Sequence, residues 1–206
     1  MHAKDPLIPI LGKTDIYVID QIMRENIAPP MRIMDVGAGR GRNTRYFLKA
    51  GYTVLGLEPK AEYFEILQDL VKRISRTSPP SNFRAESLQE NSFPDHTADV
   101  IICNAVLHLA KDHAEFDSML QGAWRLLAPG GLFFARLASS IGIEQHLTPS
   151  PTGRHPLPDG TERYLVDATQ LEAKTTELGA TWVDPLKTTV VQNERAMSTW
   201  VIRKPQ

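Results

Sequence analysis

The sequence predicts an α/β fold: a doubly wound, mostly parallel β-sheet with helices on both faces. Short, nearly continuous apolar segments alternate with amphipathic ones along the 206 residues, as expected where both faces of a parallel sheet are buried. A glycine-rich turn at residues 37–41 follows the first apolar segment. Two β-rich runs flank Asn193-Glu194 near the end of the chain, which predicts a terminal hairpin that adds an antiparallel strand.

The first half of the chain is predicted to alternate helix and strand. Residues 16–27 carry apolar side chains at helical spacing, Thr14 or Asp15 is a candidate N-cap, and Pro29-Pro30 ends the helix. Apolar runs, turn glycines and one amphipathic stretch then predict the next elements in order: strand 31–36, helix 43–50, strand 52–57, helix 61–74 and strand 82–85.

The second half continues the alternation. Its predicted elements are strand 98–104, helix 114–127, a tight Pro-Gly-Gly turn at 129–131, strand 132–137, helix 167–178 and β-rich runs 181–191 and 196–203. An irregular stretch rich in Pro, Gly and His separates the fifth strand from the last helix at residues 139–160. In sheets of this kind, ligands bind beyond the carboxyl ends of the strands.

Composition limits the class of protein. The length fits one domain over residues 1–206, and 23 basic against 24 acidic residues give a net charge of −1, so we expect no nucleic-acid partner. The single cysteine, Cys103, forms no intramolecular disulfide. Residues 1–11 lack the apolar core of a signal peptide, and no run reaches membrane-spanning length. We therefore expect a cytoplasmic protein that does not bind membranes.

The turn at residues 37–41 carries the strongest functional signal. It reads Gly-Ala-Gly-Arg-Gly, follows a strand and opens a helix, so its backbone can bend sharply and approach a ligand with free amides. Glu58 ends the second strand about 20 residues later, where a carboxylate can accept both ribose hydroxyls of an adenosine.

The spacing of the glycines and the charge beside the turn distinguish a dinucleotide cofactor from S-adenosylmethionine. A dinucleotide site needs a third glycine at position 42, where this chain has Arg42, and Asp35 beside the turn would repel a pyrophosphate. No Gly-Lys-Ser/Thr follows, which excludes a P-loop. S-adenosylmethionine has no phosphate, and its sulfonium and ammonium groups favour acidic neighbours. The residues therefore favour S-adenosylmethionine over a nicotinamide cofactor, and an oxidoreductase is the weaker alternative.

With these motifs, the chain resembles class I S-adenosylmethionine-dependent methyltransferases of the small-molecule type, the group that includes ubiquinone-biosynthesis and tellurite-resistance enzymes. The resemblance covers about residues 30–138 and implies a Rossmann-like sheet of seven strands, the last antiparallel and placed between the fifth and sixth. It also implies methyl transfer by SN2 displacement, with S-adenosyl-L-homocysteine as product.

The resemblance also implies cofactor contacts in the turn, at the ends of the first four strands and on the first helix. In the family an acid at the position of Glu86 accepts the adenine amino group, and the residue at the end of the fourth strand lies near the methionine part. The expected cofactor-binding residues are Tyr17, Asp35, Gly37, Ala38, Gly39, Arg40, Asn43, Glu58, Pro59, Glu86, Ser87, Leu88, Asn104 and Ala105.

The acceptor side gives weaker signals. His108, one turn beyond the fourth strand, is the candidate catalytic base, with a structural histidine as the equal alternative. We expect a substrate lid at residues 139–164, and substrate contacts from the following residues: Arg136, His146, Arg154 and His155. The spacing of His146, His155 and Asp159 matches no standard metal template, so we expect no metal.

Several functions remain open from the sequence alone. The preferred partner is a small-molecule methyl acceptor, and the protein is expected to be a monomer or a homodimer. The chain lacks the Asp/Asn-Pro-Pro-Tyr element of many exocyclic amine methyltransferases, which argues against methylation of DNA adenine. A catalytically silent protein that binds S-adenosylmethionine as a sensor or partner subunit is one alternative, and a protein methyltransferase is another.

Overall fold

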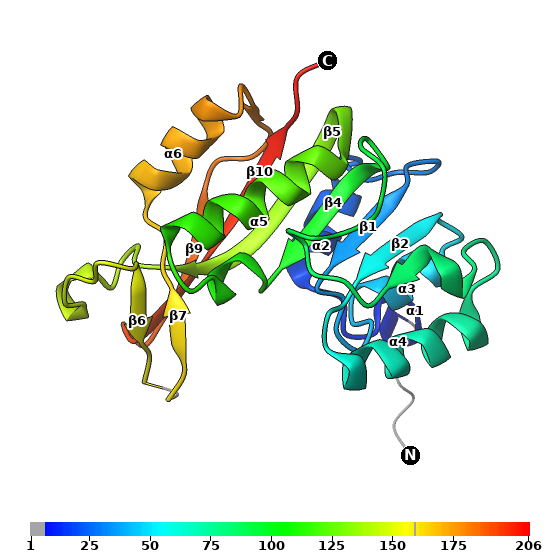
Figure 1. Ribbon diagram of the computed structural model, residues 1–206, viewed down its shortest axis with the longest axis horizontal. Coiled ribbons are helices and arrows are strands. Elements are labelled where there is room, and N and C mark those ends of the chain that lie inside the picture. The colour runs from blue at the N-terminus through cyan, green and yellow to red at the C-terminus, as the bar shows by residue number, and fades with distance from the viewer. Residues whose placement is uncertain (1–6, 159) are drawn as a thin grey trace.

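The computed structural model describes residues 7–158 and 160–206, so residues 1–6 and Asp159 lie outside the described residues. One large sheet dominates it (Figure 1). Its strands, in order across the sheet, are β3 (Phe83–Arg84), β2 (Val54–Leu57), β1 (Ile33–Val36), β4 (Ala98–Asn104), β5 (Leu127–Ser139), β10 (Arg195–Arg203) and, both beside β10, β8 (Thr181–Trp182) and β9 (Lys187–Val191).

The first five strands run parallel, and β10 is antiparallel to β5, β8 and β9. Both β8 and β9 pair with the edge of β10 that faces away from β5. A break at residues 183–186, which contains Pro185, separates them, so they act as one interrupted strand. The expected arrangement, with an antiparallel last strand between the fifth and sixth, is confirmed, and β9 and β10 form the predicted hairpin.

Helices cover both faces of the sheet, as predicted. Their bounds are α1 (Leu7–Leu11), α2 (Ile16–Met23), α3 (Thr44–Lys49), α4 (Ala61–Ile74), α5 (His113–Leu126) and α6 (Ala168–Glu177). Apolar residues of α2, α3 and α4 form one core with alternate sheet residues such as Ile102 and Phe134. Residues of α5 and α6 form the second core with the opposite face, around Trp200. None of these helices is long and apolar enough to cross a membrane.

The N-terminal part differs from the prediction at two places. The α1 helix was not predicted, because its five residues bury no side chain and carry no amphipathic signal. The α2 helix ends at Met23 rather than at residue 27. Its N-cap is Asp15, whose carboxylate accepts a hydrogen bond from the Tyr17 amide, one of the two caps that the sequence offered.

The predicted tight turn at residues 129–131 is wrong. The β5 strand begins at Leu127, directly after α5, and the Pro-Gly-Gly segment lies inside it. Pairing jumps from Ala98–Leu127 to Val100–Leu132, so β5 carries a bulge of extra residues opposite β4. Gly130, with φ of +72°, adopts the left-handed conformation that this bulge requires.

The segment at residues 139–164 is more regular than predicted. It contains a short 3₁₀ turn, η3 (Glu144–His146), and a hairpin of β6 (Arg154–Pro156) and β7 (Glu162–Tyr164). Figure 1 shows this hairpin at the end of the molecule opposite α3 and α4. Tyr164 is fully buried and stacks on Phe116, and its hydroxyl forms a hydrogen bond with His113 Nδ1. The hairpin is therefore anchored in the core beside α5.

A substitution at Gly122 in α5 tests how closely this helix packs on the loop after β3. An added Cβ would overlap the Leu88 carbonyl oxygen, which is backbone and cannot rotate away. We expect Gly122→Ala to lower the free energy of unfolding by about 1–3 kcal/mol, although alanine alone favours a helix by about 1 kcal/mol. Urea denaturation measures the change. Ser118→Ala on the exposed face is the control, and equal stability of both variants would contradict the packing.

Candidate functional site

The turn between β1 and α3 is a backbone bend that is open at Gly39, whereas Gly37 and Gly41 pack against Val106 and Leu70. Gly37, Gly39 and Gly41 have φ of +59°, +57° and +80°, a conformation that favours glycine. The Ala38 amide donates to the Leu57 carbonyl of the neighbouring strand. A Cβ at Gly39 would meet nothing closer than the Gly37 oxygen at 3.9 Å, so a ligand can approach this backbone directly.

Glu58 stands beside this bend at the end of β2. Its side chain is buried, Oε2 accepts from the Gly39 amide at 2.8 Å, and Oε1 accepts from the Lys60 amide at 2.9 Å. The carboxylate therefore joins the bend to the start of α4. It keeps acceptor capacity facing the adjoining cavity, because each oxygen has a second lone pair.

Asp35 has a structural role beneath the bend. Its Oδ2 accepts hydrogen bonds from the amide and the hydroxyl of Thr44, at the start of α3. Burial raises the pKa of Asp35 to about 6, and the Thr44 hydrogen bonds oppose this shift. Asn43 is similar, since its side chain accepts from the Asp15 amide at 3.0 Å. Both side chains hold helix starts in place.

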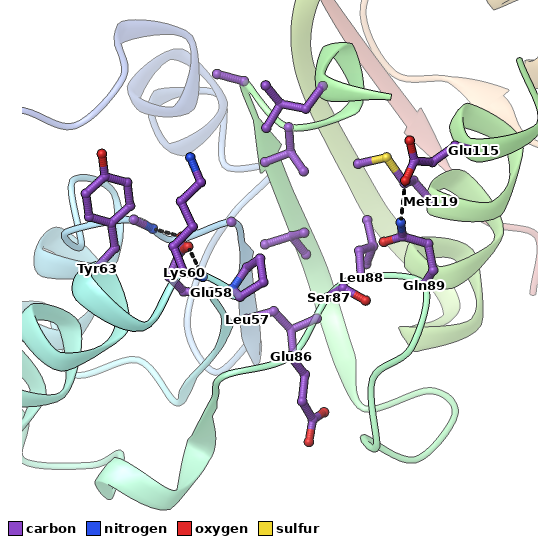
Figure 2. A pocket seen from close by; sticks show the side chains of 17 residues that line it. Leu57, Glu58, Lys60, Tyr63, Glu86, Ser87, Leu88, Gln89, Glu115 and Met119 are labelled. Carbon is purple, nitrogen blue, oxygen red and sulfur yellow. Dashed lines mark hydrogen bonds between the residues drawn. The ribbon is translucent and has the colours of Figure 1, made fainter. Parts of the chain in front are cut away.

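A cavity of about 350 Å³ opens between this bend and the first turn of α5 (Figure 2). Eight of the expected cofactor residues line it: Gly37, Gly39, Glu58, Pro59, Glu86, Ser87, Leu88 and Ala105. The remaining expected residues are not among its lining: Tyr17, Asp35, Ala38, Arg40, Asn43 and Asn104. Several further lining residues were not predicted, and they come from the start of α4, the loops after β3 and β4, and α5: Lys60, Tyr63, Gln89, Val106, Leu109, Glu115 and Met119.

Glu86 lines the cavity, but its carboxylate points away from it, as Figure 2 shows. The two oxygens accept hydrogen bonds from the amide and hydroxyl of Ser92, at 2.7 and 2.6 Å. These bonds hold the pKa of Glu86 below its usual value. The acid that the resemblance assigns to adenine recognition is thus engaged elsewhere in this structure.

Gln89 presents a different polar group to the cavity. Its Nε2 donates to Glu115 Oε1 at 3.3 Å, and Glu115 Oε2 accepts from the Lys111 amide at 2.7 Å. Because a carboxylate only accepts hydrogen bonds, Glu115 fixes the amide so that Gln89 Oε1 is left over as an acceptor. In Figure 2 this oxygen points toward Leu88 and the middle of the cavity. No sequence motif signals this pair, since its members lie 26 residues apart.

His108 lies in the 3₁₀ turn η2 (Leu107–Leu109) after β4 and is nine-tenths buried. Its Nδ1 lies 3.0 Å from the Ala138 amide, which donates to it. Burial lowers the pKa of His108 to about 4, with the charges of Arg163 and Arg136 acting in the same direction. The ring is therefore neutral with its proton on Nε2, which gives it a hydrogen to donate rather than a free base.

The expected substrate residues do not gather at one place. Arg154 braces the β6–β7 hairpin, with Nε on Glu162 at 3.0 Å and Nη1 on the Ala110 carbonyl at 2.7 Å. His146 borders a separate groove beside the β9–β10 turn, and His155 lies on β6. Arg136 lies on β5, opposite the last residue of β4, against Asp15 and the Tyr17 ring. Within the described residues, no three acidic, His or Cys side chains form a metal-binding group.

Comparison with known proteins finds a match over the central region. Residues 34–135 match the family model described as a methyltransferase domain. An uncharacterized methyltransferase of Synechocystis is 28% identical over 117 residues, which is 55% of this chain and 50% of the relative. A ubiquinone biosynthesis O-methyltransferase of Colwellia psychrerythraea is 27% identical over 144 residues, or 68% of this chain and 56% of the relative. The chain thus spans about half the length of these relatives.

Solved structures share the fold over nearly the whole chain. A protein from Methanosarcina mazei described as an S-adenosylmethionine-dependent methyltransferase has a TM-score of 0.73 at 17% identity, covering 89% of this chain and 97% of its own. A 1,6-didemethyltoxoflavin N1-methyltransferase of Burkholderia thailandensis, with its substrate and S-adenosylhomocysteine bound, has a TM-score of 0.72 at 20% identity, covering 95% and 80%. At these identities the likeness shows the fold.

The environment of His108 predicts a loss of stability in acid. The pKa of His108 is lower in the folded state, about 4, than its ordinary value of 6.5 in the unfolded chain. The neutral ring therefore contributes stability above pH 6.5, and this contribution is lost as the pH falls toward 4. Between pH 7 and 5 the loss is roughly 2 kcal/mol. We expect His108→Gln to remove most of this difference in urea denaturation. The exposed His146→Gln is the control, and an unchanged difference in His108→Gln would contradict the assigned cause.

Proposed function

Because the chain belongs to the class I S-adenosylmethionine-dependent methyltransferases, we propose that it methylates a small-molecule acceptor. S-adenosylmethionine is its cofactor and supplies an electrophilic methyl group. The acceptor's nucleophilic atom forms the new bond to carbon as the carbon–sulfur bond breaks, and its electron pair stays on sulfur. Since the reagent is already reactive, the chain's contribution is alignment, which can be worth roughly 7–11 kcal/mol in good cases.

The observation that carries the proposal is the open bend at Gly39 joined to the Glu58 carboxylate. The bend leaves room for a ligand at the backbone, and Glu58 is fixed by two amides where it can accept from ribose hydroxyls. The adjoining cavity is largely apolar on its other sides, with Leu57, Pro59 and Leu88 available to an adenine ring. These features fit a nucleoside without phosphates.

Protein substrates are less favoured. The acceptor side is bordered by α2, η2 and the β6–β7 hairpin, which supports a small acceptor over a peptide that must lie across an open surface. His108 supports the proposal as a donor that orients the acceptor, and not as the base that the sequence suggested. An acceptor that must lose a proton then releases it to another group or to water.

Gly39 gives the first test. We expect Gly39→Val to reduce S-adenosylhomocysteine affinity at least 100-fold in calorimetry, because the branched side chain enters the ligand space. Gly51→Val is the matched control: it has φ of +85°, also with open space, and lies in the turn after α3. It carries the same backbone strain without touching the cavity. Equal affinity of both variants would place the cofactor elsewhere.

A methyl-transfer assay with labelled S-adenosylmethionine and small-molecule fractions separates an enzyme from a silent binder. Binding of the cofactor without transfer of label to any fraction would favour the silent protein.

Gln89 gives the second test, on the adenine amino group. The orientation set by Glu115 makes Gln89 Oε1 the acceptor for that amine, in place of the Glu86 carboxylate that Ser92 occupies. S-inosylhomocysteine, which has oxygen instead of the amine, should bind about tenfold more weakly than S-adenosylhomocysteine, as expected for one hydrogen bond. Gln89→Met should abolish this preference in calorimetry, whereas Glu86→Gln should retain it. The reverse outcome would return the role to Glu86.

A further inference from the structure

Polar side chains stand side by side on four neighbouring strands, at the level where β4 ends. Asn104 of β4 pairs with Arg136 of β5, Arg136 with Thr199 of β10, and Thr199 with Lys187 of β9. Directly paired residues point to the same face of a sheet, here the face that α2 covers. Continuing the β1–β4 register by one residue places Gly37 next to Asn104. The row therefore begins at the glycine bend and runs away from it.

Three members of this row carry buried polar atoms that have no hydrogen-bond partner among the described residues. These atoms are Nδ2 and Oδ1 of Asn104, Nε of Arg136 and Oγ1 of Thr199. Leaving a buried donor or acceptor unpaired costs about 1–3 kcal/mol, and native proteins rarely do so. Lys187, the fourth member, is paired with Asp20 and Asp184. Unpaired groups on three adjacent strands indicate a site for a polar ligand.

The charges around Arg136 indicate that this ligand is negatively charged. Its guanidinium and that of Arg42 share one carboxylate, Asp15, at 3.4 and 3.6 Å. Both contacts are longer than the 2.7–2.9 Å of a strong charge-assisted hydrogen bond, such as the 2.7 Å between Arg32 and Asp99. Two cations with one distant anion leave an excess positive charge beside the row.

We propose that Arg136, Thr199 and Asn104 bind a carboxylate group of the methyl acceptor, an inference that rests on the proposed function. The Arg136 Nε–H, the Thr199 hydroxyl and the Asn104 amide nitrogen supply the donors that the two oxygens of a carboxylate require. Asn104 is the member of the row nearest the glycine bend, and its Oδ1 accepts from the hydroxyl or amine of the same molecule that receives the methyl group. The substrate class is a small hydroxy or amino acid.

The methionine part of the cofactor also carries a carboxylate, so the chemistry of the row suits either molecule. The distance of the row from the cofactor bend favours the acceptor. Strands lie about 4.8 Å apart, so Arg136 is about 10 Å from the β1 bend and Thr199 about 14 Å. The cavity beside the bend is lined by Ala105 but by none of the three residues. The row thus lies on the far side of Asn104 from the nucleoside. An acid enters by displacing Asp15 from Arg136, while Arg42 retains Asp15.

The test follows the Arg136 Nε–H signal in ¹⁵N-correlated NMR spectra of the full chain, assigned by its loss in Arg136→Met. S-adenosylhomocysteine is added first, with calorimetry as an independent measure of its binding. Acetate is then titrated into the saturated complex, with acetamide as the neutral counterpart. Arg42→Met tests the charge argument, because it removes one of the two positive charges that share Asp15 and leaves the row itself intact.

We expect acetate, and not acetamide, to shift the Arg136 Nε–H signal in a saturable way in the wild type. In Arg42→Met the same shift should need more acetate, because Asp15 then has Arg136 as its remaining arginine partner. A shift caused by S-adenosylhomocysteine but not by its decarboxylated analogue would assign the subsite to the cofactor and overturn the proposal. The absence of any acetate-dependent shift in a protein that binds S-adenosylhomocysteine would also overturn it. Failure to bind S-adenosylhomocysteine in calorimetry would refute the proposed function instead.

Discussion

The left-handed bend after β1 is the constraint on which the site depends. Three glycines allow it, and two amide hydrogen bonds, Ala38 to the Leu57 carbonyl and Gly39 to Glu58, fasten it to β2 and its end. The bend therefore keeps its shape only while β1 and β2 hold their register. Since both strands are buried between two layers of helices, the stability of the whole sheet sets the position of a few backbone amides.

Several charged or polar residues near the bend act on the fold rather than on a ligand. Asp35 is the clearest case, because its carboxylate is desolvated and its hydrogen bonds go to Thr44. Asn43 fastens the start of α2 by accepting from the Asp15 amide, and Glu86 orders the loop at Ser92. A motif residue can thus be required for binding without contact, since it holds in place the backbone that makes the contact.

The sequence predicted what depends on local pattern. Apolar runs and turn glycines placed the strands, and Asp15 was a recognisable cap, because those signals need only neighbouring residues. The prediction failed where distant partners decide the structure. The bulge in β5 depends on its pairing with β4, Glu86 turns away because Ser92 offers two donors, and Gln89 is oriented by a carboxylate on another element. No periodicity encodes such contacts.

The two ends of the proposed site carry opposite charge, and this has a consequence for the reaction. Glu58 supplies a carboxylate at the nucleoside end, whereas Arg136 and Arg42 exceed the single Asp15 at the other. A sulfonium between them is attracted to the first and repelled by the second until an acid neutralises the second. Because His108 Nδ1 accepts from the Ala138 amide, His108 is not free to act as a base, and the proposed site acts on the reaction through this distribution of charge.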